Sequence, residues 1–260
     1  MSKTLIAIAA LMLVGAAQAA GSTTIDLFST RQAKLRDTTV GGVLSSEVGS
    51  VGDTTILGGF RELLIDQTIT PGFGEESTIG VSGGLLKYSN EFGASSTATV
   101  RWDGRSAVTG GAINPTGLGG LNIGNTLTDL FELKVIFADG GYFFRIDAYT
   151  DATHWSSVKI SALENRSPAT SYIPMAAFLD CNNAHAGGPL VAVSCGAGGA
   201  VNFGNLGALQ VVVDVDSNSV ALDLAVNQIT AVPVPEPASA LLLLGGLGLV
   251  AGASRLRRQR

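Results

Sequence analysis

The sequence contains one Gly-x-Ser-x-Gly motif and two histidines, which are the residues that could support hydrolytic chemistry. Residues 80–84 read Gly-Val-Ser-Gly-Gly, the pattern that exposes a nucleophilic serine at a strand-to-helix turn in serine hydrolases. Residues 85–90 are too short and polar to form the helix that this turn requires, and only His154 and His185 could act as the base. We therefore predict no catalytic residues and no enzymatic activity, with a glycan-active hydrolase as the alternative.

A second chemical motif, residues 214–218, has the opening spacing of a calcium-binding EF-hand loop. Ser219 stands where that loop needs glycine, and Ala225 stands where a bidentate glutamate belongs. The polar cluster is better explained as a turn between two strands. We predict no metal site and no cofactor, and leave open a structural calcium ion held elsewhere by Asp, Asn and carbonyl oxygens.

Aromatic residues near the middle of the chain could bind a sugar. Tyr149 and Trp155 lie where a strand gives way to a loop, and an exposed ring there can stack on the apolar face of a glycan. The competing interpretation is a partly buried Trp155 that pins the loop. Glu75 and Glu76, in a Gly/Pro-containing loop, indicate a solvated turn rather than an acid/base pair. Tyr149 and Trp155 are therefore the candidate glycan contacts.

Cys181 and Cys195 are the only cysteines of the chain. In an exported protein they would form a disulfide that closes a short Gly/Ala-rich loop, with a stabilisation of about 3 kcal/mol. A metal site is the rival interpretation, but His185 is the only imidazole nearby and no second pair of ligands exists.

The N-terminus has the pattern of a secretory signal peptide. An apolar run over residues 5–17 follows Lys3 and ends at Ala17-Gln18-Ala19, a small-x-small site for signal peptidase. A membrane span needs about 20 apolar residues, so this run is too short for an anchor. We predict that residues 1–19 are removed after cleavage beside Ala17 and Ala19.

The C-terminus has a second apolar segment, residues 238–253, followed by four arginines. Because arginines beside an apolar segment stay on the cytoplasmic side, we expect a short transmembrane helix over residues 238–254 with the preceding domain facing outward. The residues expected to be retained in the cytoplasm are Arg255, Arg257, Arg258 and Arg260.

Just before this segment, three prolines in residues 232–237 hold the chain extended and accessible. The ordered set of Pro235-Glu236-Pro237, a Leu/Gly-rich apolar segment and a terminal arginine cluster resembles the PEP-CTERM tails of exopolysaccharide-producing Gram-negative bacteria. That resemblance implies recognition of Pro235, Glu236 and Pro237 by exosortase, a membrane-embedded cysteine transpeptidase, and delivery to the cell surface or matrix. A plain single-span anchor with a proline-rich stalk is the alternative.

The segment between the two ends is acidic. Residues 20–234 carry 11 Lys and Arg against 20 Asp and Glu, a net charge near −9. Such a domain repels nucleic acid, so we predict no nucleic-acid partner. Its high Gly, Ser, Thr and Val content is typical of exported β-rich proteins.

Period-two alternation of apolar residues predicts an all-β fold. Residues 97–102 form one strand with Trp102 turned inward. Residues 131–137 and 142–148 are expected to pair as a hairpin around residues 139–141, and residues 211–215 and 220–226 as a second hairpin around residues 216–219. Phe137 is expected on the inward face of its strand. Glycine-rich stretches 110–120 and 187–199 are expected to be surface loops.

These observations predict a signal peptide (1–19), one jelly-roll-like β-sandwich ectodomain (20–231) and a sorting tail (232–260). The expected precursor is tethered to the inner membrane, and the mature protein lies at the cell surface or in the extracellular matrix of a biofilm. The expected partners are exosortase, signal peptidase, the membrane and exopolysaccharide. A self-associating structural protein is the remaining alternative.

Overall fold

The computed structural model describes residues 21–69, 72, 74–184, 186–217 and 221–234. Within these ranges the fold is all-β, as predicted, because the helices are three short 3-10 turns: η1 (Leu57–Gly59), η2 (Met175–Leu179) and η3 (Phe203–Asn205). The signal peptide and the tail from residue 235 onward lie outside the described residues, as do Ala17, Ala19 and the arginine cluster.

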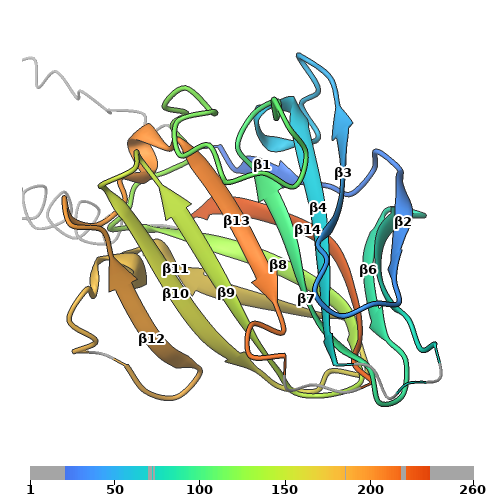
Figure 1. The fold of residues 1–260 in the computed structure, drawn as a ribbon. Coiled ribbons are helices and arrows are strands. Elements are labelled where there is room, and N and C mark those ends of the chain that lie inside the picture. The colour runs from blue at the N-terminus through green and yellow to red at the C-terminus, as the bar shows by residue number, and fades with distance from the viewer. Residues whose placement is uncertain (1–20, 70–71, 73, 185, 218–220, 235–260) are drawn as a thin grey trace, which may run out of the picture.

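The strands form two seven-stranded sheets that face each other (Figure 1). Sheet A has the order β11-β8-β14-β6-β5-β2, and β1 also pairs with β14. Its strands are β1 (Thr23–Asp26), β2 (Gln32–Asp37), β5 (Ser77–Ser82), β6 (Leu85–Asn90), β8 (Asp129–Ala138), β11 (Ala169–Pro174) and β14 (Asp223–Pro233).

Sheet B has the order β12-β10-β9-β13-β7-β4-β3. Its strands are β3 (Leu44–Gly49), β4 (Phe60–Ile69), β7 (Ser95–Trp102), β9 (Tyr142–Tyr149), β10 (Trp155–Ala162), β12 (Leu190–Cys195) and β13 (Ala208–Val213). All strand pairs within the two sheets are antiparallel. The two-sheet sandwich is therefore confirmed, while its likeness to a jelly roll stays a prediction.

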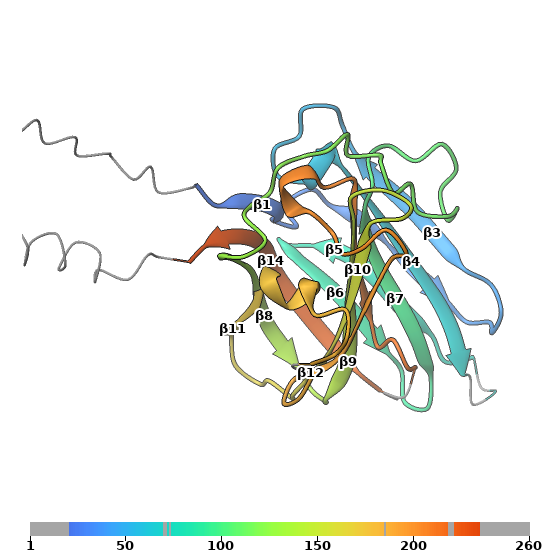
Figure 2. The same ribbon diagram turned by 90° about the vertical axis from the view of Figure 1, so that its left-hand side faces the viewer.

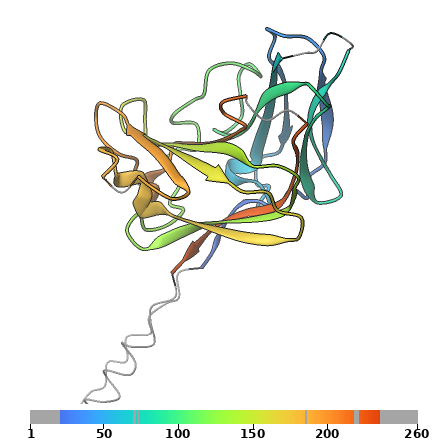
Figure 3. The ribbon, with the colours of Figure 1, turned by 90° about the horizontal axis from the view of Figure 1, so that it is seen from below.

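The core fills the space between the sheets, which Figure 3 shows from below. Alternate residues of each strand point inward, as the sequence predicts: Ala98, Val100 and Trp102 of β7 are fully buried. One residue that was predicted to face the core, Phe137, does not enter it. In β8 the register against β14 shifts after Val135, so Ala138 enters the core and Phe137 stays half-buried.

Both predicted hairpins are wrong. β8 and β9 follow each other through residues 139–141, but β8 pairs with β11 and β14 while β9 pairs with β10 and β13. Likewise, β13 belongs to sheet B and β14 to sheet A. Each connection crosses from one sheet to the other. Alternation fixes which residues of a strand face the core, but it does not say on which side of the core the next strand lies.

The Gly-x-Ser-x-Gly motif is part of a β-hairpin. β5 and β6 pair as far as Ser82 and Leu85, and Gly83 and Gly84 between them have φ angles of 63° and 74°. A two-residue hairpin loop needs positive φ at these positions, which glycine adopts without strain. Ser82 therefore lies at the exposed end of a strand that is followed by another strand.

The predicted disulfide between Cys181 and Cys195 is present, with a Cα–Cα distance of 5.4 Å. It joins the segment just after η2 to β12, one of the two edge strands of sheet B. The stretch 187–199, expected to be loop, contains β12 because the alternating residues 190–194 pair with β10 and bury Val193.

The two ends of the described chain lie side by side (Figure 2). Thr23 pairs with Ala231 and Thr24 with Thr230, and these strands are antiparallel, so both ends leave the sandwich at the same end. β14 remains paired to Pro233, which is opposite Asp129 of β8. Among the described residues, no helix has the length and apolar character to span a membrane.

Candidate functional site

The outer face of sheet B carries a row of polar side chains that crosses four neighbouring strands. Alternation along each strand turns Glu62 (β4), Arg101 (β7), Gln210 (β13) and Asp147 (β9) away from the core, and the strand registers place them opposite one another. We call these four residues the polar ladder. Each of them is at most 9% exposed.

Hydrogen bonds connect every step of the polar ladder. Arg101 Nη1 donates to Glu62 Oε2 over 3.0 Å, and Arg101 Nε donates to Gln210 Oε1 over 3.3 Å. Gln210 Nε2 in turn donates to Asp147 Oδ2 over 2.7 Å. Because each group is held by its neighbours, the ladder forms a rigid base on this face.

Arg145 extends the ladder toward solvent. Its Nε lies 3.0 Å from Asp147 Oδ2, and its side chain is 36% exposed whereas that of Asp147 is 4% exposed. Asp147 contacts only Nε, and neither Nη atom of Arg145 has a hydrogen-bond partner in the part of the chain that the structure describes, so both can donate to a ligand. Arg145 is therefore a positioned hydrogen-bond donor for a polar ligand.

An aromatic pair lies at one end of β9 and β10. Tyr149 and Trp155 are cross-strand neighbours whose ring centroids are 6.3 Å apart at an interplanar angle of 37°. Both are half-buried, and burial raises the pKa of Tyr149, which keeps the phenol protonated as a hydrogen-bond donor. An apolar surface with a polar edge is the arrangement that can stack on a sugar ring and bind its hydroxyls.

At the other end of β9, Phe143 also faces outward, and the Lys159 ammonium lies 4.8 Å from the centre of its ring. Lys159 Nζ is bound by Asp216 at 2.6 Å. The distance from Phe143 to Tyr149 along the strand is about 20 Å at the rise of an extended chain. The outer face of β9 and β10 thus presents aromatic rings at both ends and Arg145 between them.

The glycine-rich stretch 196–199 packs on the aromatic end. A Cβ atom at Gly196 would lie 2.6 Å from Trp155 Cδ1, and one at Gly198 would lie 2.8 Å from the ring of His154. Only glycine permits this approach. Trp155 therefore packs against the stretch 196–199, a different loop from the one considered in the sequence analysis, and it remains half-buried.

His154 is bound by Asp151, with Nδ1 2.9 Å from Oδ2. Hydrogen bonds from the backbone amides of Thr153 and His154 lower the pKa of Asp151. The pair shapes the turn between β9 and β10. His185, the other candidate base, lies outside the described residues.

Three carboxylates hold the loop that follows β7 against the outer face. Glu47 accepts the amide of Ser106 at 2.7 Å, Glu62 accepts that of Gly110 at 2.5 Å, and Asp103 accepts that of Asn114 at 2.8 Å. Burial raises the pKa of both Glu62 and Asp103. The loop is thereby fixed beside the ladder by its backbone.

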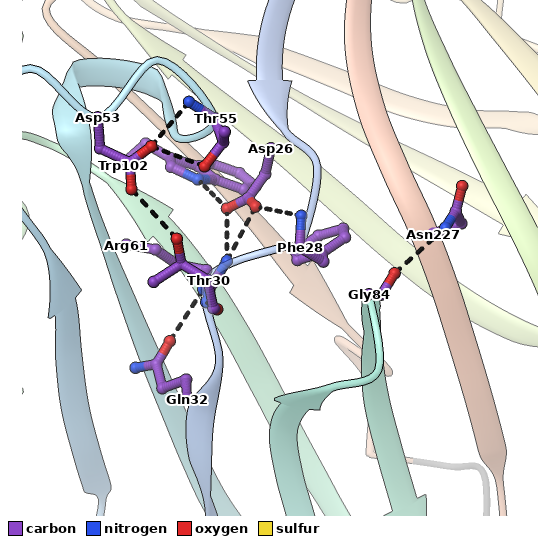
Figure 4. Close-up of polar contacts among 10 residues, drawn as sticks. All are labelled: Asp26, Phe28, Thr30, Gln32, Asp53, Thr55, Arg61, Gly84, Trp102 and Asn227. Carbon is purple, nitrogen blue, oxygen red and sulfur yellow. Dashed lines mark hydrogen bonds and ion pairs between the residues drawn. The ribbon is translucent and has the colours of Figure 1, made fainter.

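A second polar network lies inside the sandwich (Figure 4). Arg61 Nη1 contacts both carboxylate oxygens of Asp26 at 2.9 and 3.0 Å, and Trp102 Nε1 donates to Asp26 Oδ2 at 2.9 Å. The remaining Arg61 nitrogens donate to Gln32 and to the carbonyl of Thr30. Arg61 and Asp26 are fully buried, so this network fixes β1, β2, β4 and β7 and offers nothing to solvent.

The sandwich also has an apolar cleft of about 620 Å³, lined by β8 and β11 of sheet A and by β9 and β10 of sheet B. Inward positions of β11 hold the small residues Ala169 and Ser171, which leave space opposite Tyr142, Phe144 and Ile160. The lining of the cleft is mainly apolar, with Glu164 and Asn165 among its few polar residues, so the cleft fits an apolar group better than a sugar.

The remaining sequence candidates have structural partners. Glu76 pairs with Arg36 at 2.6 Å, which lowers the pKa of Glu76, and Asp216 pairs with Lys159. No group of three or more His, Cys, Asp or Glu that could hold a metal occurs in the part of the chain that the structure describes. The polar ladder and Arg145 were not among the residues predicted from the sequence. The signal for the ladder in the sequence is a polar residue at an outward position of each of four strands. These strands are far apart in the sequence, and only the strand order of the sheet brings the four residues together.

Comparison with known proteins identifies the C-terminal segment. Residues 233–258 match the PEP-CTERM protein-sorting motif. The match confirms the predicted resemblance and indicates an exported precursor that is sorted through its C-terminus. It overlaps the sandwich only at Pro233, the last residue of β14. No curated protein matches the chain.

Three solved structures resemble the fold weakly. A family 11 carbohydrate-binding module from Clostridium thermocellum in complex with a β-1,3-1,4-mixed-linked tetrasaccharide has 10% identity and a TM-score of 0.39, covering 83% of this chain and 98% of that one. The family 11 module of the cellulosomal cellulase Lic26A-Cel5E of Clostridium thermocellum has 11% identity and a TM-score of 0.35, with coverages of 83% and 96%. PfGH50B has 9% identity and a TM-score of 0.39. The similar region covers 67% of this chain but only 23% of PfGH50B. These scores are too low to support a statement about function.

Proposed function

We propose that this chain, which carries a PEP-CTERM sorting motif at residues 233–258, is exported, sorted to the cell surface or exopolysaccharide matrix, and binds glycan there without catalysis. The proposed binding face is the outer face of β9 and β10 in sheet B. The observation that carries the binding half is the combination of the hydrogen-bonded polar ladder with Arg145, Tyr149 and Trp155.

The outer face has the chemistry that glycan binding needs. Tyr149 and Trp155 supply aromatic surface, and Arg145 supplies Nη donors that have no hydrogen-bond partner among the described residues. Because the ladder fixes Arg145 through Asp147 before any ligand arrives, binding would cost little side-chain ordering. The acidic character of the domain favours a neutral or weakly charged glycan over a polyanionic one.

The sorting half follows from the tail. Pro235, Glu236 and Pro237 are the proposed recognition residues for an exosortase-type transpeptidase, and the arginines at the C-terminus would keep that end in the cytoplasm until processing. The paired ends of the sandwich suit this route, because the signal-peptide junction and the sorting motif leave the same end of the folded domain.

A glycan array probed with residues 20–234 tests the binding half. We expect binding that Trp155→Ala and Tyr149→Ala each weaken by about tenfold, a change of about 1.4 kcal/mol in binding free energy. Tyr172→Ala is the matched control, since Tyr172 is 56% exposed but lies on β11 of the other sheet. Equal affinity for all variants, or no binding at all, would contradict the proposal.

Sedimentation and product analysis of the same samples separate the alternatives. A self-associating structural protein would assemble without sugar, and a glycan-active hydrolase would release products and lose this activity when one carboxylate is changed. A monomer that binds glycan and leaves it intact is the result that the proposal expects.

A further inference from the structure

The folded domain ends directly at the sorting motif. Pro233 is still paired with Asp129 of β8, and only Val234 separates it from Pro235. The apolar segment of the tail begins at Ala238, and the four residue-to-residue steps from Val234 to Ala238 can span at most about 15 Å. A tail inserted in a bilayer would therefore hold this end of the sandwich, the exit end, close to the lipid surface.

Two segments that meet at the exit end carry no charged residue although the domain is acidic, and Asp129 beside them is only 8% exposed. Residues 106–128 and residues 186–213 contain no Asp, Glu, Lys or Arg. The two segments meet there: Ile123 N donates to the carbonyl of Phe203, and Leu121 and Leu206 exchange backbone hydrogen bonds. An uncharged surface can approach a bilayer without the desolvation and repulsion that the acidic remainder of the domain would encounter.

A rigid turn presents an apolar side chain at this end. Leu127 is 72% exposed and lies two residues before Asp129, the partner of Pro233. The turn is fixed because Asn125 Oδ1 accepts the amide of Leu127 at 2.9 Å and Asp129 Oδ2 accepts the amide of Asn125 at 2.7 Å. The loop before β8 runs beside the end of β14 (Figure 2).

We propose that the turn 125–129 contacts the interfacial layer of a phospholipid bilayer through Leu127 while the tail is inserted. The contact sets the orientation of the domain above the membrane and thereby the approach to Pro235-Glu236-Pro237. It adds to the anchoring by the tail, because burial of one leucine is far too weak to hold a protein on a membrane by itself. The inference rests on membrane insertion of the tail, which is part of the proposed function.

Quenching by brominated lipid tests the contact in the mature chain with its tail, residues 20–260, reconstituted in phosphatidylcholine vesicles. Leu127→Trp places a fluorophore at the turn, and Phe92→Trp is the control, because Phe92 is 87% exposed and follows β6 near the start of β14, at the opposite end of that strand. The wild type gives the background of Trp102 and Trp155. We expect quenching of the added emission to be several-fold greater for Leu127→Trp than for Phe92→Trp.

Equal, weak quenching of both variants in vesicle-bound protein would overturn the lipid contact and leave the proposed sorting intact. If Leu127→Asp then slowed processing in cells, the turn would instead contact the transpeptidase. Failure of the wild type to associate with vesicles would overturn tail insertion, and the lipid contact with it.

Discussion

Two neighbouring strands each contribute adjacent residues to both polar networks, the buried one around Asp26 and the polar ladder. These residues are Arg61 and Glu62 on β4, and Arg101 and Trp102 on β7. Arg61 and Trp102 point inward to Asp26, and Glu62 and Arg101 point outward into the polar ladder. Both networks use an arginine, a carboxylate and an amide. The inner one is closed on all sides, whereas the outer one ends at Arg145, whose side chain is 36% exposed.

This difference separates a structural network from a candidate binding surface. In the inner network the nitrogens of Arg61 and both carboxylate oxygens of Asp26 have protein partners. In the outer network the buried ladder orders a group that can still reach a ligand. Both networks contain arginine, carboxylate and amide side chains, so residue type does not tell a structural network from a binding surface. The exposed side chain of Arg145 at the end of the outer network does.

The largest expected effect is on stability, from breaking the inner network. Arg61→Met leaves the Asp26 carboxylate buried without its cation, so we expect the unfolding free energy of the ectodomain to fall by about 3–5 kcal/mol. Urea denaturation measures this. The control is Arg36→Met, which removes the exposed ion pair with Glu76 and should cost less than about 1 kcal/mol. Equal losses for the two variants would remove the distinction between the networks.

Asp147→Ala should act on the outer network in two ways. Loss of an acceptor for Gln210 and Arg145 should lower the unfolding free energy by about 1–3 kcal/mol, less than Arg61→Met. It should also weaken glycan binding, because Arg145 loses its fixed position. If denaturation shows the loss in stability while affinity is unchanged, the ladder is purely structural.

The smallest expected effect is a pH dependence. Burial raises the pKa of Glu62, so the native state binds this proton more tightly than the unfolded chain, and the contribution of Glu62 to stability falls as the pH rises through its native pKa. The contribution of Glu76 to stability has the opposite pH dependence. Its ion pair with Arg36 lowers its pKa, so this contribution is lost as the pH falls. Denaturation of Glu62→Gln and Glu76→Gln at neutral and mildly acidic pH should change the slope of stability with pH in opposite directions.

The sequence predicts the local features of the fold well. Alternation correctly turns Trp102 and the inner faces of β7, β9 and β14 toward the core, and the presence of only two cysteines in a chain expected to be exported correctly predicts the disulfide. It fails on the connections, because an arch between two sheets and a hairpin within one sheet can have the same turn residues and the same alternation. The shift in β8 that displaces Phe137 depends on its pairing with β14, which begins 85 residues after β8 ends.

The candidate site was only partly predictable for the same reason. Tyr149 and Trp155 are close in sequence and could be paired by inspection. The four ladder residues come from strands spread over residues 60–213, and only the order β9-β13-β7-β4 makes them neighbours. The sorting motif needs no such long-range information, since its recognition residues are contiguous.

Intact mass of the mature protein tests sorting, the central claim, most directly. The protein would be taken from membrane, periplasm and medium of its native host and compared with a variant in which Pro235, Glu236 and Pro237 are alanines. We expect a surface or medium species that lacks the residues beyond the motif and is absent in the variant. An intact C-terminus in both proteins would contradict processing and leave only a membrane anchor.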